Sequence, residues 1–282
     1  MLNVIHMNMT LTQCKYGCVR DEKDDRDFKK TATFIEHVAL TLRQGSTLLR
    51  IVKPKSVDLR DKFPKVWNQR NLGSCTGHGI AALDTYVRMF EKLSTWEASR
   101  LFVYYNERVI EGTVNSDDGA QIRDGMKSLA TQGVCPEEMW AYDDSTDPGS
   151  KFTQRPPREC YDEAAKHVAV QYYRLDNKSL NSLKACLDAN GAFVFGFDVF
   201  ESFEEIEWTQ ADCVMPVPKR GEKCMGGHCV CAVGYSDEKQ AFLIRNSWGT
   251  SWCEKEQGHF WLPFSIMTSD MVSDVWTLTL AK

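Results

Sequence analysis

The hydrophobic pattern of the chain changes near its midpoint, and this change limits the folds that the chain can adopt. In the first half, apolar residues recur at helical spacing in the segments 75–93, 98–112 and 120–133. The second half holds segments rich in Val, Phe, Tyr and Trp, typical of strands, and one short helical segment over 179–190. The expected strands cover 167–175, 192–200, 228–236, 241–248, 258–263 and 275–280. Helices followed by strands predict an α+β fold, with a helical lobe over about 55–155 and a β-rich lobe over about 156–282.

The first 54 residues differ from the rest of the chain. Residues 20–30 are almost all charged, and the following stretch has one apolar helical face that it cannot bury alone. That face comprises Phe34, Ile35, Val38 and Leu42, with Gly45 as a helix stop. Pro54 then favours extended backbone. We therefore start the main domain near Lys55 and treat 1–54 as an N-terminal extension, a short propeptide or a regulatory segment.

Composition excludes several classes of protein. A chain of 282 residues can bury one large core or two small ones. The net charge of -5 argues against a broad electrostatic grip on nucleic acid. No apolar run approaches the length of about 18 residues that a membrane span needs. The N-terminal stretch is a poor secretory signal, which favours an intracellular or reducing setting.

The eleven cysteines are an odd number, so at least one thiol is unpaired or bridges to another chain. In a reducing setting most of them are expected to be buried free thiols. Under oxidising conditions some could pair, and the sequence does not give the connectivity. The candidates for such pairing are Cys14, Cys18, Cys224, Cys229 and Cys231.

The first segment that carries chemistry is residues 68–79, NQRNLGSCTGHG. Gly73 and Ser74 form a tight lead into a helix that begins near Cys75. The positive end of a helix dipole lowers the pKa of a thiol placed there and favours the reactive thiolate. Gln69 precedes Cys75 by six residues and can direct its amide N–H at the same space. The alternative for this segment alone is a buried structural cysteine at a helix start.

Two later segments supply a base and a residue to orient it. His228 lies between two glycines and a β-run in residues 226–237. Asn246 ends a strand in residues 244–262, and Trp248 follows it. An Asn oxygen that accepts from one imidazole nitrogen fixes the tautomer, so the other nitrogen can face a thiol. The remaining histidines, His6, His37, His78, His167 and His259, have no comparable context.

Together these three segments resemble the papain family of cysteine peptidases. The carrying motifs are Gln followed six residues later by Cys in Gly-Ser-Cys, Gly-His before a β-run ending in VGY, and NSWGTSW, in the family's order. The resemblance covers about residues 55–282, and SVDLRDKFP is similar to the family's mature N-terminus. It implies a papain-like two-lobed fold, with the active site in a cleft between a helical lobe and an antiparallel β-barrel-like lobe.

The resemblance also implies catalytic roles. Cys75 would be the nucleophile, His228 its base, Asn246 the residue that orients His228, and Gln69 an oxyanion-hole donor beside the Cys75 amide. Peptide or protein substrates would be hydrolysed through a thioester, without a metal or organic cofactor. Endopeptidase activity is the default expectation, since the chain lacks the paired-His insertion of dipeptidase relatives.

The resemblance implies a set of substrate-binding residues as well. Gly119 and Ala120 stand where the family has a glycine pair bordering the substrate backbone, and Trp248 would cover the His–Asn hydrogen bond. Asp274 lies near the region that forms the floor of the family's main specificity pocket, where a carboxylate would favour a basic side chain. The alternative for Asp274 is a carboxylate solvated beside a strand.

Several positions depart from the family pattern. Thr76 replaces the aromatic residue after the nucleophile, and Leu72 replaces a cysteine that forms a disulfide in secreted members. Cys253 stands in place of a glycine. The family's usual long proregion is absent, so we expect residues 1–54 to regulate access to the cleft as in a zymogen, with the helix around 34–42 docked on the catalytic domain.

Other functional classes stay open at this point. Cys224, Cys229 and Cys231 with His228 could form a metal or redox module, although zinc sites usually use pairs of cysteines two to four residues apart. A non-catalytic binding protein can share the fold, because fold alone does not fix function. A transferase or amidase could use the same residues. No nucleic-acid or membrane partner is expected, and the sequence does not give the oligomeric state.

Overall fold

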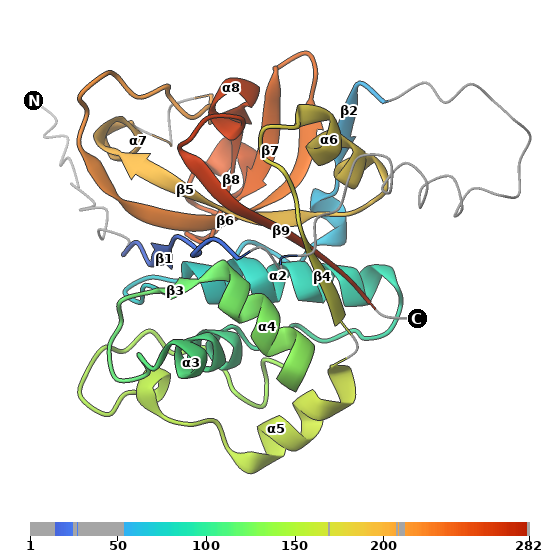
Figure 1. The fold of residues 1–282 in the computed structure, drawn as a ribbon, viewed down its shortest axis with the longest axis vertical. Coiled ribbons are helices and arrows are strands. Elements are labelled where there is room, and N and C mark those ends of the chain that lie inside the picture. Colours follow the sequence, from blue (N-terminus) through green and yellow to red (C-terminus); the bar gives the residue numbers. More distant parts are fainter. Residues whose placement is uncertain are drawn as a thin grey trace, which may run out of the picture.

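The computed structural model describes residues 15–24, 27, 54–168, 170–206, 208 and 212–280. Helices form one lobe and an antiparallel sheet forms the other, with helix α2 (Cys75–Phe90) lying along the boundary between them (Figure 1). The helical lobe also contains α3 (Arg100–Glu111), α4 (Ile122–Gln132) and α5 (Arg158–Ala164). No helix in this described part is long and apolar enough to span a bilayer.

The second lobe is a seven-stranded sheet with the order β4-β9-β5-β6-β7-β8, and β2 pairs with β6 beside this path. Every pairing in it is antiparallel, and the strands described here do not close into a barrel. The strands are β2 (Ser56–Asp58), β4 (Val170–Arg174), β5 (Phe193–Phe200), β6 (Cys224–Ser236), β7 (Ala241–Arg245), β8 (His259–Pro263) and β9 (Val272–Leu280). Three short helices flank it: α6 (Leu180–Asp188), α7 (Glu201–Glu205) and α8 (Phe264–Met267).

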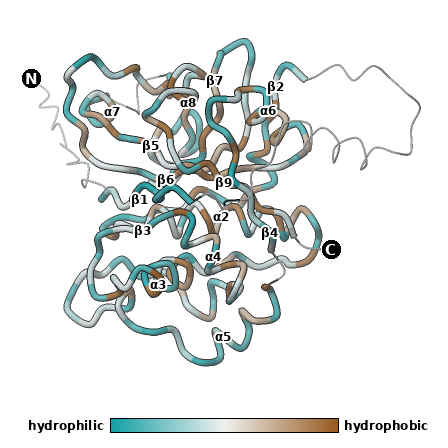
Figure 2. The backbone as a smooth tube through the Cα atoms, in the orientation of Figure 1, coloured by the Kyte–Doolittle hydropathy of each residue, from teal (hydrophilic) through white to brown (hydrophobic). Residues whose placement is uncertain are grey.

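Local signals in the sequence account for the main elements. Helix α3 begins after Ser99, whose hydroxyl accepts from the Phe102 amide at 3.1 Å, and it ends at Gly112, which adopts a left-handed φ of 74°. In α2 the apolar positions Ile80 and Leu83 are fully buried between the lobes. Hydrophobic stretches concentrate in the helices and strands, while the outer loops are largely hydrophilic (Figure 2). All three long helices and all six strands expected from the sequence are present.

Helix α5 and strand β2 show where the boundary between the two lobes lies in the sequence. Helix α5 lies with the other helices, where the Tyr161 hydroxyl donates to Asn106 at 3.0 Å, so the chain leaves the helical lobe after α5 rather than at residue 155. At the start of the domain, β2 pairs with β6 and thus belongs to the sheet. Extended backbone was expected here, but three residues are too few to show a strand period, so β2 was not predicted as a strand of the sheet.

One disulfide was not expected from the sequence. Cys213 and Cys253 are bonded, with their Cα atoms 6.0 Å apart. Cys253 adopts a positive φ of 48°, which accounts for the glycine that the family carries at this position. The described residues include the free cysteines Cys18, Cys75, Cys135, Cys160, Cys224, Cys229 and Cys231. The expectation that the thiols are mostly free therefore misses this one pair.

The beginning of the described chain lies between the two lobes. Residues 15–24 are called the N-terminal segment below. They include strand β1 (Cys18–Val19), which pairs in parallel with β3 (Ala120–Gln121), the strand that immediately precedes α4 in the sequence (Figure 1). The helix expected around residues 34–42 lies outside the described residues. What the structure does describe of the extension is thus an extended strand at the lobe boundary.

Candidate active site

Cys75 is the first residue of α2, as the sequence predicted. Its side chain is fully buried, and its sulfur accepts a hydrogen bond from the Cys229 amide at 3.4 Å. The turn before it is held by Tyr142, whose hydroxyl donates to the Gln69 carbonyl oxygen at 2.7 Å and contacts the Ser74 hydroxyl at 2.7 Å. Tyr142 is a positioning residue that the sequence did not reveal.

Thr76, the departure next to Cys75, faces away from the thiol. Its hydroxyl donates to the Glu107 carboxyl group on α3 at 2.5 Å. Burial raises the pKa of Glu107 well above its usual range, against the opposing hydrogen bond from Thr76. The Thr76 substitution thus serves packing between α2 and α3.

His228 and Asn246 form the expected pair. The Nε2 atom of His228, on β6, lies 2.8 Å from Oδ1 of Asn246, just after β7. Because this oxygen only accepts, Nε2 carries the proton, and Nδ1 keeps its lone pair. Nδ1 is buried and has no hydrogen-bond partner within the described part of the chain. Trp248 stacks on the imidazole at a centroid distance of 4.9 Å and shields the pair from water.

The Gln69 side chain is fixed at both ends. Its Oε1 accepts from the Ser247 hydroxyl at 2.5 Å, and its Nε2 donates to the Leu72 carbonyl oxygen at 3.0 Å. Nε2 also donates to the backbone carbonyl oxygen of Lys15 at 3.0 Å. Ser247 was not among the residues expected from the sequence, although it lies within the NSWGTSW motif. The expected oxyanion donor is therefore already hydrogen-bonded to a backbone carbonyl oxygen of the chain itself.

The Gly119–Ala120 edge is also occupied by the N-terminal segment. The Ala120 amide donates to the Gly17 carbonyl oxygen at 2.9 Å, and Cys18 lies opposite Ala120 in the β1–β3 pairing. A Cβ atom on Gly119 would lie only 2.0 Å from this same Gly17 oxygen. The edge expected to border a substrate backbone thus binds a backbone already.

The segment fits closely around the catalytic side chains. A Cβ atom on Gly17 would come within 1.8 Å of the Gly73 carbonyl oxygen, so only glycine can pass here. The ring of Tyr16 packs edge-on against His228 at 5.8 Å, and its hydroxyl donates to Glu204 at 2.7 Å. This close approach seals the site from solvent.

Burial shifts the pKa values of Cys75 and His228, the two candidate catalytic groups. It raises the pKa of the Cys75 thiol far above its usual range, and the neighbouring Cys18 adds to this effect. Burial also lowers the pKa of His228 to about 4, against the opposing hydrogen bond to Asn246. In this covered form, burial thus opposes the lowering of the Cys75 pKa that was expected from the start of the helix.

Asp274 is neither solvated nor free to pair with a substrate. It is 3% exposed and has a positive φ of 53°. Its carboxylate accepts from Arg174 at 2.7 Å and from the Asp21 amide at 2.9 Å. The Asp274 carboxylate, which was expected to pair with a basic substrate side chain, is therefore already paired with Arg174.

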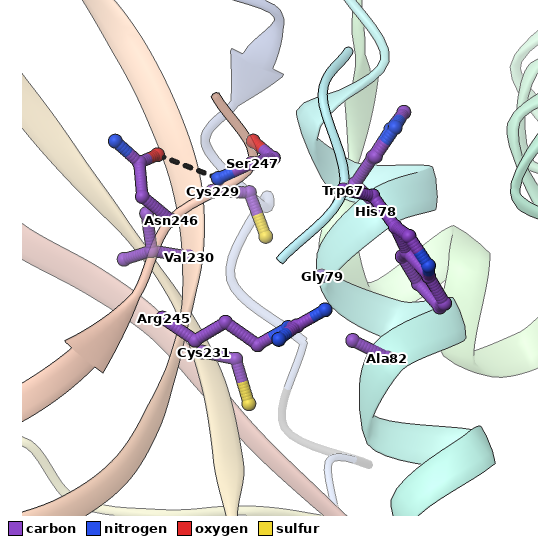
Figure 3. Close-up of a pocket in the computed structure, with 10 residues that line it drawn as sticks. All are labelled: Trp67, His78, Gly79, Ala82, Cys229, Val230, Cys231, Arg245, Asn246 and Ser247. Carbon is purple, nitrogen blue, oxygen red and sulfur yellow. Dashed lines mark hydrogen bonds between the residues drawn. The ribbon is translucent and has the colours of Figure 1, made fainter. Parts of the chain in front are cut away.

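A cavity of about 10 Å³ lies behind the catalytic residues and has room for about one water molecule. Arg245 reaches into it from β7 toward α2, while Cys229 and Cys231 face it from β6 (Figure 3). The Arg245 guanidinium donates to the carbonyl oxygens of Pro64 and Lys65, both at 2.7 Å. Within the residues that the structure describes, no group of three or more His, Cys, Asp or Glu side chains could hold a metal ion.

Comparisons with known proteins agree with this geometry. Residues 53–267 match the model of the papain family cysteine proteases. The chain is 33% identical to an uncharacterized peptidase C1-like protein of Acanthamoeba polyphaga mimivirus, over 96% of this chain and 89% of the relative. It is 29% identical to cysteine proteinase 1 of Entamoeba histolytica, over 73% of this chain and 63% of that protein.

Solved structures give the same result. Xylellain, a cysteine protease from Xylella fastidiosa, is similar with a TM-score of 0.81 and 36% identity, covering 95% of this chain and 96% of that one. The digestive procathepsin L2 of Tenebrio molitor shares the fold, with a TM-score of 0.68 and 18% identity, over 95% of this chain and 78% of that one. The expected papain-like fold and cysteine peptidase activity are thereby confirmed, and the chain belongs to the papain family of cysteine proteases.

Proposed function

We propose that this cysteine peptidase is an endopeptidase in which Cys75 is the nucleophile, His228 the general base and acid, and Asn246 the residue that orients the imidazole. The observation that carries this assignment is the 2.8 Å bond between His228 Nε2 and Asn246 Oδ1, since it leaves Nδ1 as the free base. The position of Cys75 at the start of α2 supports its role. The substrates are peptides or proteins.

The reaction follows from these positions once the site is open to water. His228 Nδ1 takes the Cys75 proton, and the thiolate attacks the substrate carbonyl carbon. Gln69 Nε2 and the Cys75 amide donate to the oxyanion that forms. The imidazolium then protonates the leaving amine, and a thioester remains on Cys75. Water activated by neutral His228 hydrolyses the thioester and restores the thiol.

We further propose that residues 1–54 are an inhibitory extension of a peptidase domain over 55–282. The N-terminal segment offers a carbonyl to Gln69 and a strand to Ala120, which are the two places where a substrate backbone would bind. Its contacts also keep Cys75 and His228 buried and neutral, so the segment prevents the nucleophile from forming. Because the nucleophile does not form while the segment is bound, the segment is not itself hydrolysed.

The nucleophile is tested by Cys75→Ala in the full chain carrying Gly17→Ala, which opens the site, with Cys224→Ala as the matched control because Cys224 is an exposed free thiol. Both variants are assayed for peptide hydrolysis and for labelling by a thiol-reactive epoxide under reducing conditions. Cys75→Ala is expected to lose hydrolysis and labelling while Cys224→Ala keeps both. Hydrolysis by the Cys75→Ala variant at the rate of its Gly17→Ala parent would refute the assignment.

The inhibitory role is tested by Gly17→Ala. The added Cβ would meet the Gly73 oxygen at 1.8 Å, so the segment cannot seat and the full chain should hydrolyse peptides faster than wild type. Lys23→Ala is the control, because its side chain is exposed in the same segment. Equal rates for wild type and Gly17→Ala, with both folded, would show that the segment does not restrain the enzyme.

A further inference from the structure

Three free thiols meet where the N-terminal segment covers the active site: Cys18, Cys75 and Cys229. Pairing with Ala120 fixes the backbone of Cys18 on one side. On the other side, two glycines of the sheet lobe leave room for it. A Cβ on Gly227 would lie 2.2 Å from the Cys18 carbonyl oxygen, and a Cβ on Gly196 would lie 3.0 Å from its sulfur. The Cys18 side chain is thus directed at the sheet.

The two other thiols differ in their relation to Cys18. Gly196, beside which the Cys18 sulfur lies, is the direct partner of Cys229 in the β5–β6 pairing, so the side chains of Cys18 and Cys229 meet on the same face of the sheet. The Cys75 sulfur lies on α2, on the other side of this contact, and accepts from the Cys229 amide at 3.4 Å. The geometry therefore selects Cys229, rather than the nucleophile, as the partner for Cys18.

We propose that Cys18 and Cys229 form a reversible disulfide that ties the N-terminal segment to the floor of the active site. The oxidant is a low-molecular-weight disulfide, RSSR. Cys18 reacts first, because it is partly exposed whereas Cys229 is 1% exposed. The Cys18 thiolate attacks one sulfur of RSSR, forms a mixed disulfide and releases RS⁻. Cys229 gives its proton to RS⁻ and attacks the Cys18 sulfur, which releases a second thiolate.

The exchange balances and leaves the nucleophile untouched. Two cysteine thiols and one RSSR yield one protein disulfide and two RSH, with the second released thiolate taking up the proton that Cys18 lost. Cys75 stays reduced beneath the segment. The bond makes the covering of the site covalent, so the enzyme can open only after reduction. This consequence rests on the proposed inhibitory role of the segment, while the bond itself does not.

The test uses the full chain, oxidised with glutathione disulfide, quenched in acid, alkylated, digested and mapped by mass spectrometry. A peptide linking Cys18 to Cys229 is expected in wild type and in Cys75→Ala, and it should be absent from Cys229→Ser. The control variant Cys224→Ser should still form the link, because Cys224 is exposed at the far end of β6. A link from Cys18 to Cys75 or Cys14, or no link at Cys18, would overturn the proposal.

A second measurement asks whether the bond holds the site closed. In oxidised wild type with a mapped Cys18–Cys229 bond, the epoxide should label Cys75 at least tenfold more slowly than in the reduced protein. Added dithiothreitol should restore the rate. Labelling at the reduced rate while the bond is present would contradict the proposed closure. Failure of the nucleophile assignment would instead appear as hydrolysis by Cys75→Ala, which is independent of this mapping.

Discussion

The Nε2 atom of Gln69 donates a 3.0 Å hydrogen bond to the backbone carbonyl oxygen of Lys15. The donor that would stabilise a substrate oxyanion is therefore bound to a peptide carbonyl of the same chain. The Ser247 hydroxyl fixes the other end of this amide at 2.5 Å, and this bond does not involve the N-terminal segment. The proposed inhibitory contact and the proposed catalytic contact thus use one atom.

Replacement of Gln69 by Ala should slow the chemical step. In the Gly17→Ala background, which opens the site, loss of one oxyanion donor should lower kcat by about 10²–10³-fold, equivalent to about 2.7–4 kcal/mol. KM should change little, because the donor acts mainly on the charge that develops in the transition state. Steady-state kinetics on a peptide measures both. Asn71→Ala, an exposed change in the same loop, is the control, and an unchanged kcat for Gln69→Ala would contradict the role.

Ser247→Ala should produce a smaller loss of the same kind. Without the hydroxyl, Gln69 keeps its donor but loses the partner that holds Oε1, so its amide can rotate away from the oxyanion. We expect kcat in the Gly17→Ala background to fall between the values for intact Gln69 and for Gln69→Ala. A double variant should be no slower than Gln69→Ala alone, since both changes act through one side chain. Additive losses would show that Ser247 acts elsewhere.

His228→Ala should lose more activity than Asn246→Ala. His228 moves the proton, and loss of a general acid–base group typically costs about 10²–10⁴-fold. Asn246 only holds the imidazole through its 2.8 Å bond. The comparison is the ratio of kcat/KM values in the Gly17→Ala background, with circular dichroism to check folding. If folded Asn246→Ala proves the slower of the two, the roles assigned to these residues are wrong.

Inhibition by the segment should weaken as pH rises through about 6. Burial, and then the nearby Asp274 carboxylate, raise the pKa of Asp21 from 3.8 to about 6 in the docked segment, against hydrogen bonds from the Arg123 amide and the Trp276 indole. The docked segment therefore binds this proton more tightly than a free segment does. Its contribution to docking is complete below pH 3.8 and is lost as pH passes about 6.

Hydrogen exchange of residues 15–24 can measure this dependence in Cys75→Ala, where no hydrolysis interferes. Wild-type Asp21 should give stronger protection at pH 4.5 than at pH 7.5, after correction for intrinsic exchange rates. Asp21→Asn, which stays neutral, should remove most of the difference. Greater protection at pH 7.5 in the protein with Asp21 would mean that the carboxylate docks as an anion balanced by Arg123 and Arg174.

The sequence alone determined the elements whose signals are local. The helical spacing around Ile80 and Leu83 predicted α2, and the β-runs after His228 and before Asn246 predicted β6 and β7. The order of the three motifs was enough to indicate the family. The catalytic roles of Cys75, His228, Asn246 and Gln69 stay predictions that the variants above test. These inferences succeed because periodicity and motif spacing depend on residues close in the chain.

Only the tertiary structure decided how the site is held in this state. Strand β1 has only two residues and lies beside a run of charges, so no local pattern predicts it. Its partner Ala120 lies about a hundred residues away in the sequence. The disulfide between Cys213 and Cys253 and the ion pair between Arg174 and Asp274 likewise join distant positions. The raised pKa of Cys75 follows from burial, and burial depends on every chain segment that packs around the thiol.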